Sequence, residues 1–202
     1  MAKPLKKNND DFYTQAVLLA AVVKRLLKRK SDNDLSEKPT YELKSITEFM
    51  KRMRVTSLGK FEGRTYISTV NFYENDEKFE ANKPLGAVIL HLPEEHAVKL
   101  LGSLGYPVYD ENEESVLEDA CGTFCNLIAG SFKSGLIELG YKELKMSHFS
   151  SYQNEIINGV AFNPEQKQYY EIGFVIDGQK RMIIDLTLAR VPREGEISDF
   201  YF

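Results

Sequence analysis

The stretch ACGTFCNLIAGSFKSG, residues 120 to 135, decides which fold this sequence can adopt. Apolar residues recur in and around it at helical spacing, so we predict a helix from about residue 115 to 139. On a wheel of about 100° per residue, one broad side is apolar and predicted to be buried: Val116, Leu117, Ala120, Phe124, Leu127, Ile128 and Leu136. The other side carries small and polar residues, which we call the polar stripe: Asp119, Thr123, Asn126, Gly130 and Lys133.

The polar stripe is unusual for an exposed helical surface. Asn126 is a poor helix former because its amide competes for backbone hydrogen bonds, and Gly130 costs about 1 kcal/mol relative to alanine. One interpretation is a binding surface, on which glycine lets another backbone come close. The other is that Gly122 and Gly130 permit close packing of a neighbouring helix while Asn126 caps a chain segment. The residues alone leave both interpretations open.

The composition is that of an ordinary globular domain. The chain has 202 residues, of which 43% are hydrophobic and 28% charged. A chain of this length buries enough surface to fold without disulfides or structural metal ions. The net charge of −4 argues against nonspecific nucleic-acid binding, which needs a surplus of cations. Cys121 and Cys125 lie four residues apart on one predicted helix, a position that does not favour a disulfide between them. Two cysteines are also too few ligands for a zinc site. We therefore expect a protein of the reducing cytoplasm.

The N-terminal region predicts a flexible segment, residues 1–9, followed by an amphipathic helix at 11–30. The cluster KRLLKRK closes this helix. Its cations either complement the helix dipole or form a basic patch for RNA or anionic lipid. The longest apolar run, residues 16–23, is shorter than the about 20 residues of a membrane span, so no membrane anchor and no export signal are expected.

The domain boundaries follow from composition. We predict a single domain over residues 10–190 and a C-terminal tail at 191–202, with residues 31–53 as an addition to the domain. Within this addition, residues 31–40 resemble a linker. A short helix is predicted at 44–53, with one apolar stripe made by Ile46, Phe49, Met50 and Met53.

The remaining segments predict strands and one further helix. VTSLGKF and RTYISTVNFY flank Glu62-Gly63 and predict a hairpin, and Asp177-Gly178 predicts a second one. LGAVILHL reads as a central strand, followed by a helix at 93–102. We therefore predict an α+β fold: a largely antiparallel sheet of about six strands with long helices packed on one face. No internal repeat is evident in the sequence.

The opening stretch resembles the signature of the CheC/CheX/FliY family of chemotaxis phosphatases. In that family a helix carries Glu, two variable residues and Asn, and typically continues M-I-A-G-N-A-K-S. The positions that match this pattern are Asn126, Leu127, Ile128, Ala129, Gly130, Lys133 and Ser134. LGAVILHLPEEHAVKLLGSLG resembles the family's strand-then-helix unit upstream of that helix, and IINGVAF and FVIDGQKRMIIDLTL resemble the family's segments downstream of it. The likeness covers roughly residues 55–190 and implies a CheX-like fold.

The resemblance also implies a bacterial signalling function. The family hydrolyses the aspartyl phosphate of the response regulator CheY, which itself supplies the phosphorylated Asp and Mg²⁺. Asn126 would orient the attacking water, since an amide can both donate to and accept from it, and positioning supplies much of the catalysis in phosphoryl transfer. The chain itself would need no cofactor, and no metal cluster or glycine-rich phosphate loop is visible in it.

Two positions depart from the family pattern. Thr123 stands where the Glu that engages a lysine of the regulator belongs, and a hydroxyl cannot form a salt bridge. Asp119, one turn earlier, could reach across from about 6 Å along the axis. Asn154 stands where a proline is expected in the second family motif.

Three interpretations of the polar stripe remain open at this stage. The first is a working phosphatase, with Asn126 and Thr123 at the catalytic positions and Asp119, Gly130 and Lys133 binding a phosphorylated CheY-type receiver domain. The second is a catalytically inactive module of the same fold that binds a receiver domain or another flagellar or signalling partner without turnover, and the third is a homodimer contact or dimeric scaffold. None of these requires nucleic acid or membrane.

Overall fold

The computed structural model describes residues 8–30, 35–108, 114–176 and 178–196. Its helices are α1 (Asn8–Lys30), α2 (Asp76–Glu80), α3 (Glu94–Ser103) and α4 (Glu114–Glu138). Its strands are β1 (Thr40–Ser45), β2 (Glu48–Phe49), β3 (Arg52–Thr56), β4 (Thr65–Tyr73), β5 (Gly86–Pro93), β6 (Lys145–Met146), β7 (Ser150–Gln153), β8 (Glu155–Val160), β9 (Gln168–Ile176) and β10 (Gln179–Leu188). Within these described ranges, no helix is long and apolar enough to cross a membrane.

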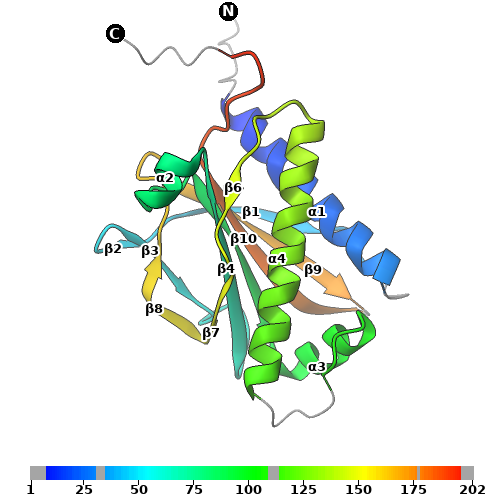
Figure 1. Ribbon diagram of the computed structural model, residues 1–202. Helices are drawn as coiled ribbons and strands as arrows, with labels where there is room; N and C mark the ends of the chain where they lie inside the picture. The colour runs from blue at the N-terminus through cyan, green and yellow to red at the C-terminus, as the bar shows by residue number, and fades with distance from the viewer. Residues whose placement is uncertain (1–7, 31–34, 109–113, 177, 197–202) are drawn as a thin grey trace, which may run out of the picture.

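The predicted α+β class is confirmed. A main sheet of seven strands has the order β1-β9-β10-β5-β4-β6, with β7 also paired to β4, and every pairing in it is antiparallel. The long helices α1 and α4 lie on one face of this sheet (Figure 1). A small sheet, β2-β3-β8, stands apart from them beside the other face.

The core forms on both faces of the main sheet. All eight residues of β5 are buried, because α4 covers one face of the strand and the small sheet approaches the other. Val88, Leu90 and Leu92 join the larger core under the helices, while Ala87 and Ile89 join the smaller core beneath β3 and β8. This alternation follows from the two-residue period of a strand. It explains why LGAVILHL is apolar almost without interruption.

The long helices match the sequence prediction within three residues at each end, but the predicted helix at 44–53 is wrong. Residues in that range form parts of β1, the hairpin of β2 with β3, and its turn. Met50 and Lys51 occupy that turn with φ of 49° and 62°, a left-handed conformation that ends any helix. Phe49 and Met50 are exposed, so the apolar spacing did not mark a buried face. Residues 40–45 build the edge of the main sheet, and the idea that 31–53 is an addition stays a prediction.

The two predicted hairpins have different outcomes. β9 and β10 pair directly around Gly178, as Asp177-Gly178 predicted, although Asp177 itself lies outside the described residues. The hairpin around Glu62-Gly63 is wrong, because β3 belongs to the small sheet and β4 to the main sheet. Residues 57–64 therefore connect two sheets and do not form a tight turn within one.

The two halves of the chain repeat one arrangement. α1, β1, β3, β4 and β5 have as counterparts α4, β6 with β7, β8, β9 and β10, in the same order along the chain. β5 and β10 pair at the centre, β1 pairs with β9 as β6 and β7 pair with β4, and β3 pairs with β8. The fold is therefore a two-fold structural repeat, although no repeat is evident in the sequence.

Asn154 makes the corner at which the chain leaves the main sheet after β7 and enters the small sheet as β8. Its φ is 59°, a conformation that Asn tolerates better than most residues. Its Oδ1 accepts a hydrogen bond from the Thr65 N–H at 2.9 Å, and its own N–H donates to the Thr65 carbonyl at 2.8 Å. Proline could not occupy this corner, since its ring fixes a negative φ.

Candidate functional site

Helix α4 lies across the main sheet (Figure 1), and its apolar side is buried in the core, as predicted. Most of the residues predicted to be buried are buried, and Val116 and Leu127 are half-buried against the same core. Cys121, Cys125, Ala129 and Phe132 add to the buried side. The burial of this broad face fixes which residues of α4 remain in contact with solvent.

The polar stripe is the outward side of α4. Asp119, Thr123 and Asn126 are exposed, whereas Gly130 and Lys133 are half-buried. Within the described ranges, none of the three exposed side chains makes a hydrogen bond or an ion pair. Thr123 and Asn126 lie one turn apart, so a hydroxyl and an amide face solvent side by side. The arrangement leaves the Asn126 amide free to bind water or a partner.

The two glycines near the polar stripe have different roles. A Cβ on Gly122 would lie 2.1 Å from the ring of Phe149 and 2.8 Å from Ser151 Oγ. Gly122 therefore serves packing, although its neighbour is a loop residue and not a helix. A Cβ on Gly130 would meet no atom within 4 Å. Packing among the described residues thus does not explain Gly130, which opens the surface next to Asn126.

Lys133 is already engaged within the chain. Its Nζ lies 2.8 Å from Glu143 Oε1, in the segment after α4. The hydrogen bond and charge of Lys133 lower the pKa of Glu143. A partner that binds Lys133 must therefore compete with Glu143, so Lys133 is less available than the other residues of the polar stripe.

The N-terminal half of α4 is held by polar contacts with the main sheet. Gln153 of β7 donates through Nε2 to Glu114 and, at 2.9 Å, to Glu118 Oε1. Ser151 Oγ donates to the Glu118 carbonyl at 2.9 Å, and Arg64 pairs with Glu114 at 3.1 Å. Glu118 is therefore turned toward β7 and away from Asn126, so it does not supply the carboxylate that the resemblance predicts beside Asn126.

The counterpart helix α1 carries no second asparagine site. The two helices show nearly the same sequence of buried and exposed positions when Thr14 is matched with Thr123, and this match places Val17 at the position of Asn126. Val17 is exposed but cannot orient a water molecule. Of these two matched positions, only the one on α4 therefore offers an exposed amide.

The cysteines of α4 take no part in an exposed site. Cys121 and Cys125 are free and fully buried, and Cys125 Sγ donates to the Ser68 carbonyl at 3.4 Å. Burial raises the pKa of both thiols, that of Cys125 to about 12. Because the thiolate is the reactive form, neither is a nucleophile at neutral pH.

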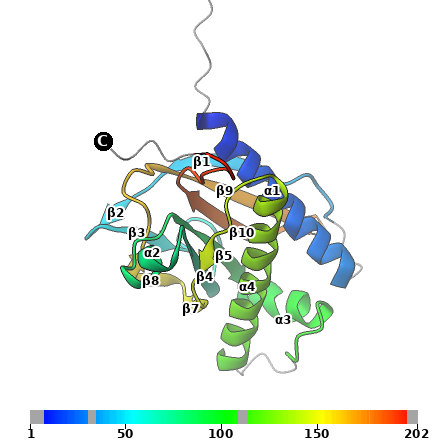
Figure 2. The ribbon, with the colours of Figure 1, turned by 45° about the horizontal axis from the view of Figure 1, so that its top comes forward.

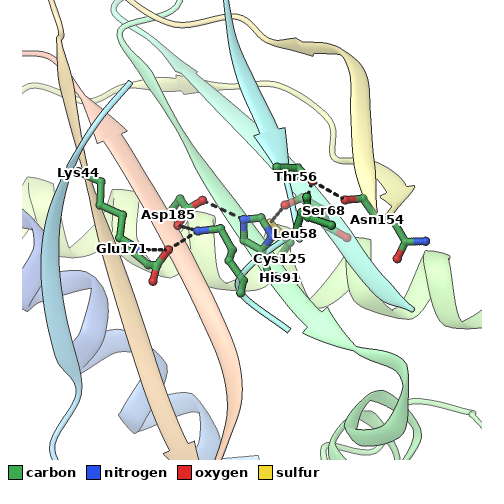
Figure 3. Close-up of polar contacts among 10 residues, drawn as sticks. Lys44, Thr56, Leu58, Ser68, His91, Cys125, Asn154, Glu171 and Asp185 are labelled. Carbon is green, nitrogen blue, oxygen red and sulfur yellow. Dashed lines mark hydrogen bonds and ion pairs between the residues drawn. The ribbon is translucent and has the colours of Figure 1, made fainter. Parts of the chain in front are cut away.

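A second group of polar residues, which the sequence analysis missed, lies on the opposite face of the main sheet. Figure 3 shows His91, Asp185, Glu171 and Lys44 converging there. Lys60, from the loop after β3, pairs with Glu171 and with Asp185 Oδ1 at 2.9 Å. Lys44 pairs with Glu171 at 2.9 Å, and His91 Nε2 donates to Asp185 Oδ2 at 2.9 Å. We call these residues the buried ionic network.

The buried ionic network supports the fold. Burial opposes ionisation of Asp185, but His91 and Lys60 outweigh it and lower the pKa of that carboxyl. Burial likewise opposes ionisation of Glu171, and Lys60 and Lys44 lower its pKa. His91 Nδ1 has no partner among the described residues, so no nucleophile is aligned with it. The network thus fastens the loop that carries Lys60 to the main sheet. A single polar residue inside each of the apolar runs AVILHL and MIIDL, namely His91 and Asp185, was the available sequence signal.

No metal centre is formed in the part of the chain that the structure describes, since no three His, Cys, Asp or Glu residues there could hold an ion. Fold and site together define a class of protein: a two-fold-repeated α+β domain that presents an asparagine-bearing helix outward.

The comparisons with known proteins show which proteins the chain resembles. The family model described as "Chemotaxis phosphatase CheX" matches residues 81–158, which include β5, α3 and α4 with Asn126. Among solved structures, the FliY of Thermotoga maritima has a TM-score of 0.60 at 16% identity, covering 94% of this chain and 93% of that chain. The chemotaxis protein CheX of Vibrio vulnificus has a TM-score of 0.57 at 14% identity, covering 86% and 98%. The resemblance to the CheC/CheX/FliY family is confirmed, and the chain has that family's fold.

A third similar structure contains a partner. It is the CheX–CheY–BeF₃–Mg²⁺ complex from Borrelia burgdorferi, with a TM-score of 0.53 at 13% identity, covering 87% of this chain and 98% of that chain. No curated protein matches the chain at a significant level.

Proposed function

We propose that this chain docks on the phosphorylated form of a CheY-type receiver domain through the polar stripe of α4. One observation carries the proposal: Asn126 is exposed and its amide has no partner within the described part of the chain. The open space around Gly130 supports it, because a partner backbone can approach α4 closely there. The match to the CheX family model, which spans α4, and the complex of a CheX with CheY support the same partner.

Hydrolysis of the receiver's aspartyl phosphate is the finer proposal, and the free Asn126 amide favours it. The receiver supplies the phosphorylated Asp and Mg²⁺, and Asn126 orients the water in line with phosphorus. Such positioning lowers the barrier because it removes the entropy cost of bringing water and phosphorus together. Thr123 provides only a hydroxyl where the family has Glu. Asp119, one turn from Thr123 and exposed, is the nearest carboxylate of the polar stripe that could engage a lysine of the receiver.

Docking is tested by measuring complex formation with a CheY-type receiver carrying beryllofluoride and Mg²⁺. Gly130→Leu fills the open surface of α4 and is expected to weaken the complex at least tenfold, by steric exclusion at a close contact. Glu77→Leu is the control, because it places the same side chain on an exposed position of α2, away from α4. It should leave the affinity unchanged.

The oligomeric state separates docking from the homodimer interpretation. If the polar stripe is a contact between two copies, Gly130→Leu shifts a dimer to monomers in sedimentation velocity and leaves receiver binding intact. That result would overturn the docking proposal. A monomeric chain that loses receiver binding through Gly130→Leu supports it.

A further inference from the structure

The segment that follows α4 runs back along the side of the helix that carries Asn126. Glu143 pairs with Lys133 at 2.8 Å, and the ring of Phe149 occupies the Cβ position of Gly122. At about 100° per residue, Lys133 and Gly122 both point within about 40° of Asn126. Figure 2 shows β6 and β7 along one side of α4 and α1 along the other, as does Figure 1. The segment that contains Phe149 therefore borders the polar stripe.

Two residues of α4 stand one turn before Asn126 and flank the direction of its side chain: Gly122 and Thr123. Side chains on a helix lean toward its N-terminus, so the Asn126 amide covers the turn that contains these two residues. Thr123 borders the amide with a methyl group and a hydroxyl. Gly122 has no side chain, and the Phe149 ring stands at its Cβ position. The Asn126 amide therefore projects between the side chain of Thr123 and the ring of Phe149.

Phe149 is held in place by the chain on both sides of it. The Ser147 N–H donates to the Asn71 carbonyl at 2.9 Å, and Ser147 Oγ accepts from the Asn71 N–H at 3.0 Å. Ser151 Oγ donates to the Glu118 carbonyl at 2.9 Å. The Phe149 ring itself is half-buried and packs against the larger core. The main sheet and α4 together therefore fix the position of the ring.

The ring can lie here only because residue 122 is glycine, since any Cβ at that position would overlap it. Glycine in a helix interior weakens the helix relative to alanine. The fold therefore contains a helix-weakening residue at the place where it admits a ring beside Asn126.

We infer that Phe149 is a positioning residue for Asn126: its ring limits the conformations of the Asn126 side chain and excludes water from one side of the amide. The inference rests on the proposed function, in which that amide orients the attacking water. An exposed side chain exchanges among staggered rotamers, and a side chain that is ordered before docking loses less entropy on docking. Because positioning supplies much of the catalysis in phosphoryl transfer, an ordered amide raises the rate of the chemical step.

The positioning is tested first in the free chain, by NMR of the Asn126 side-chain amide. The ring of Phe149 shifts the resonances of nearby protons, so Phe149→Leu should move both amide proton signals of Asn126. It should also lower the order parameter of that amide, because one wall beside it is lost. Phe79→Leu is the matched control, since it removes an exposed ring from α2, away from α4. The control should leave the Asn126 signals and order parameter unchanged.

The second measurement is the decay of a phosphorylated CheY-type receiver with Mg²⁺ at increasing concentrations of the full chain. Phe149→Leu should lower the maximal acceleration about tenfold, because a displaced positioning group acts at the chemical step. The concentration that gives half-maximal acceleration should change less than about twofold, because the docking surface around Gly130 is intact. Phe149→Tyr keeps the ring and should retain the acceleration. If Phe149→Leu fails to fold by circular dichroism, Phe149→Met replaces it.

The outcomes separate this inference from the proposed function. If the unchanged chain neither binds the receiver nor accelerates its decay, the proposed function fails, and the NMR measurement still decides whether Phe149 orders the amide. An unchanged order parameter together with unchanged maximal acceleration in Phe149→Leu would overturn the inference and leave Phe149 a packing residue. Weaker binding with unchanged maximal acceleration would also overturn it, because Phe149 would then be a docking contact.

Discussion

Gly122 and Gly130 lie about two turns apart on α4 in opposite surroundings. The Cβ position of Gly122 is occupied by the ring of Phe149, while that of Gly130 is open. The same helix therefore contains one glycine that packing requires and one whose Cβ position no described residue occupies. The two glycines therefore allow packing and surface exposure to be tested separately on one helix.

Alanine at the two positions should act in opposite directions. Gly130→Ala is expected to stabilise the chain by about 0.5–1 kcal/mol, since alanine is the better helix former and nothing obstructs its methyl group. Gly122→Ala is expected to destabilise it by about 1–3 kcal/mol, because Phe149 or α4 must move. Urea unfolding of both variants measures the two changes. Equal effects would contradict the packing role of Gly122.

Lys60 is expected to be the most sensitive residue of the buried ionic network. Lys60→Met removes the cation shared by Asp185 and Glu171 and leaves two buried carboxylates with less compensation. We expect a loss of about 3–5 kcal/mol in the free energy of unfolding. Arg54→Ala is the control, since Arg54 and Glu155 form an exposed pair of the kind that contributes about 0–1 kcal/mol. Similar losses in the two variants would show that the network contributes no more than a surface pair.

The buried ionic network should also make stability depend on acid pH. The pKa of Asp185 and that of Glu171 are lowered in the folded chain, so both carboxyls bind protons more weakly there than in the unfolded chain. Their contribution is complete above the unfolded values of about 4 and is lost as pH falls further through the folded values. The free energy of unfolding should therefore decrease as the pH is lowered from about 6 to about 3. Lys60→Met should flatten this decline, and an unchanged slope in that variant would argue against the assignment.

The sequence predicted the elements in which the apolar spacing continues over many residues. Both long helices and the hairpin around Gly178 follow from spacing and turn residues, and they carry the fold class and the polar stripe. The short range 44–53 was misassigned because Phe49 and Met50 are apolar yet exposed, and no local pattern distinguishes such residues from a buried stripe. The predicted hairpin at Glu62-Gly63 is wrong because β3 pairs with β8, which is distant in the sequence. This pairing, and not the local turn residues, places β3 in the small sheet.

The candidate site divides in the same way. The exposure of Asp119, Thr123 and Asn126 follows from helical periodicity, so it could be predicted. The contact of Gly122 with Phe149 and the pairing of Lys133 with Glu143 depend on the path of the chain after α4, which periodicity does not specify.

The central claim is that α4 presents Asn126 to a phosphorylated receiver. It is tested most directly by the decay rate of a phosphorylated CheY-type receiver with Mg²⁺, with and without this chain. The account predicts that the chain accelerates decay, that Asn126→Ala abolishes the acceleration while binding persists, and that Thr123→Glu increases it. A decay rate that is unchanged by the chain and by Thr123→Glu, with no complex detected, would contradict the claim.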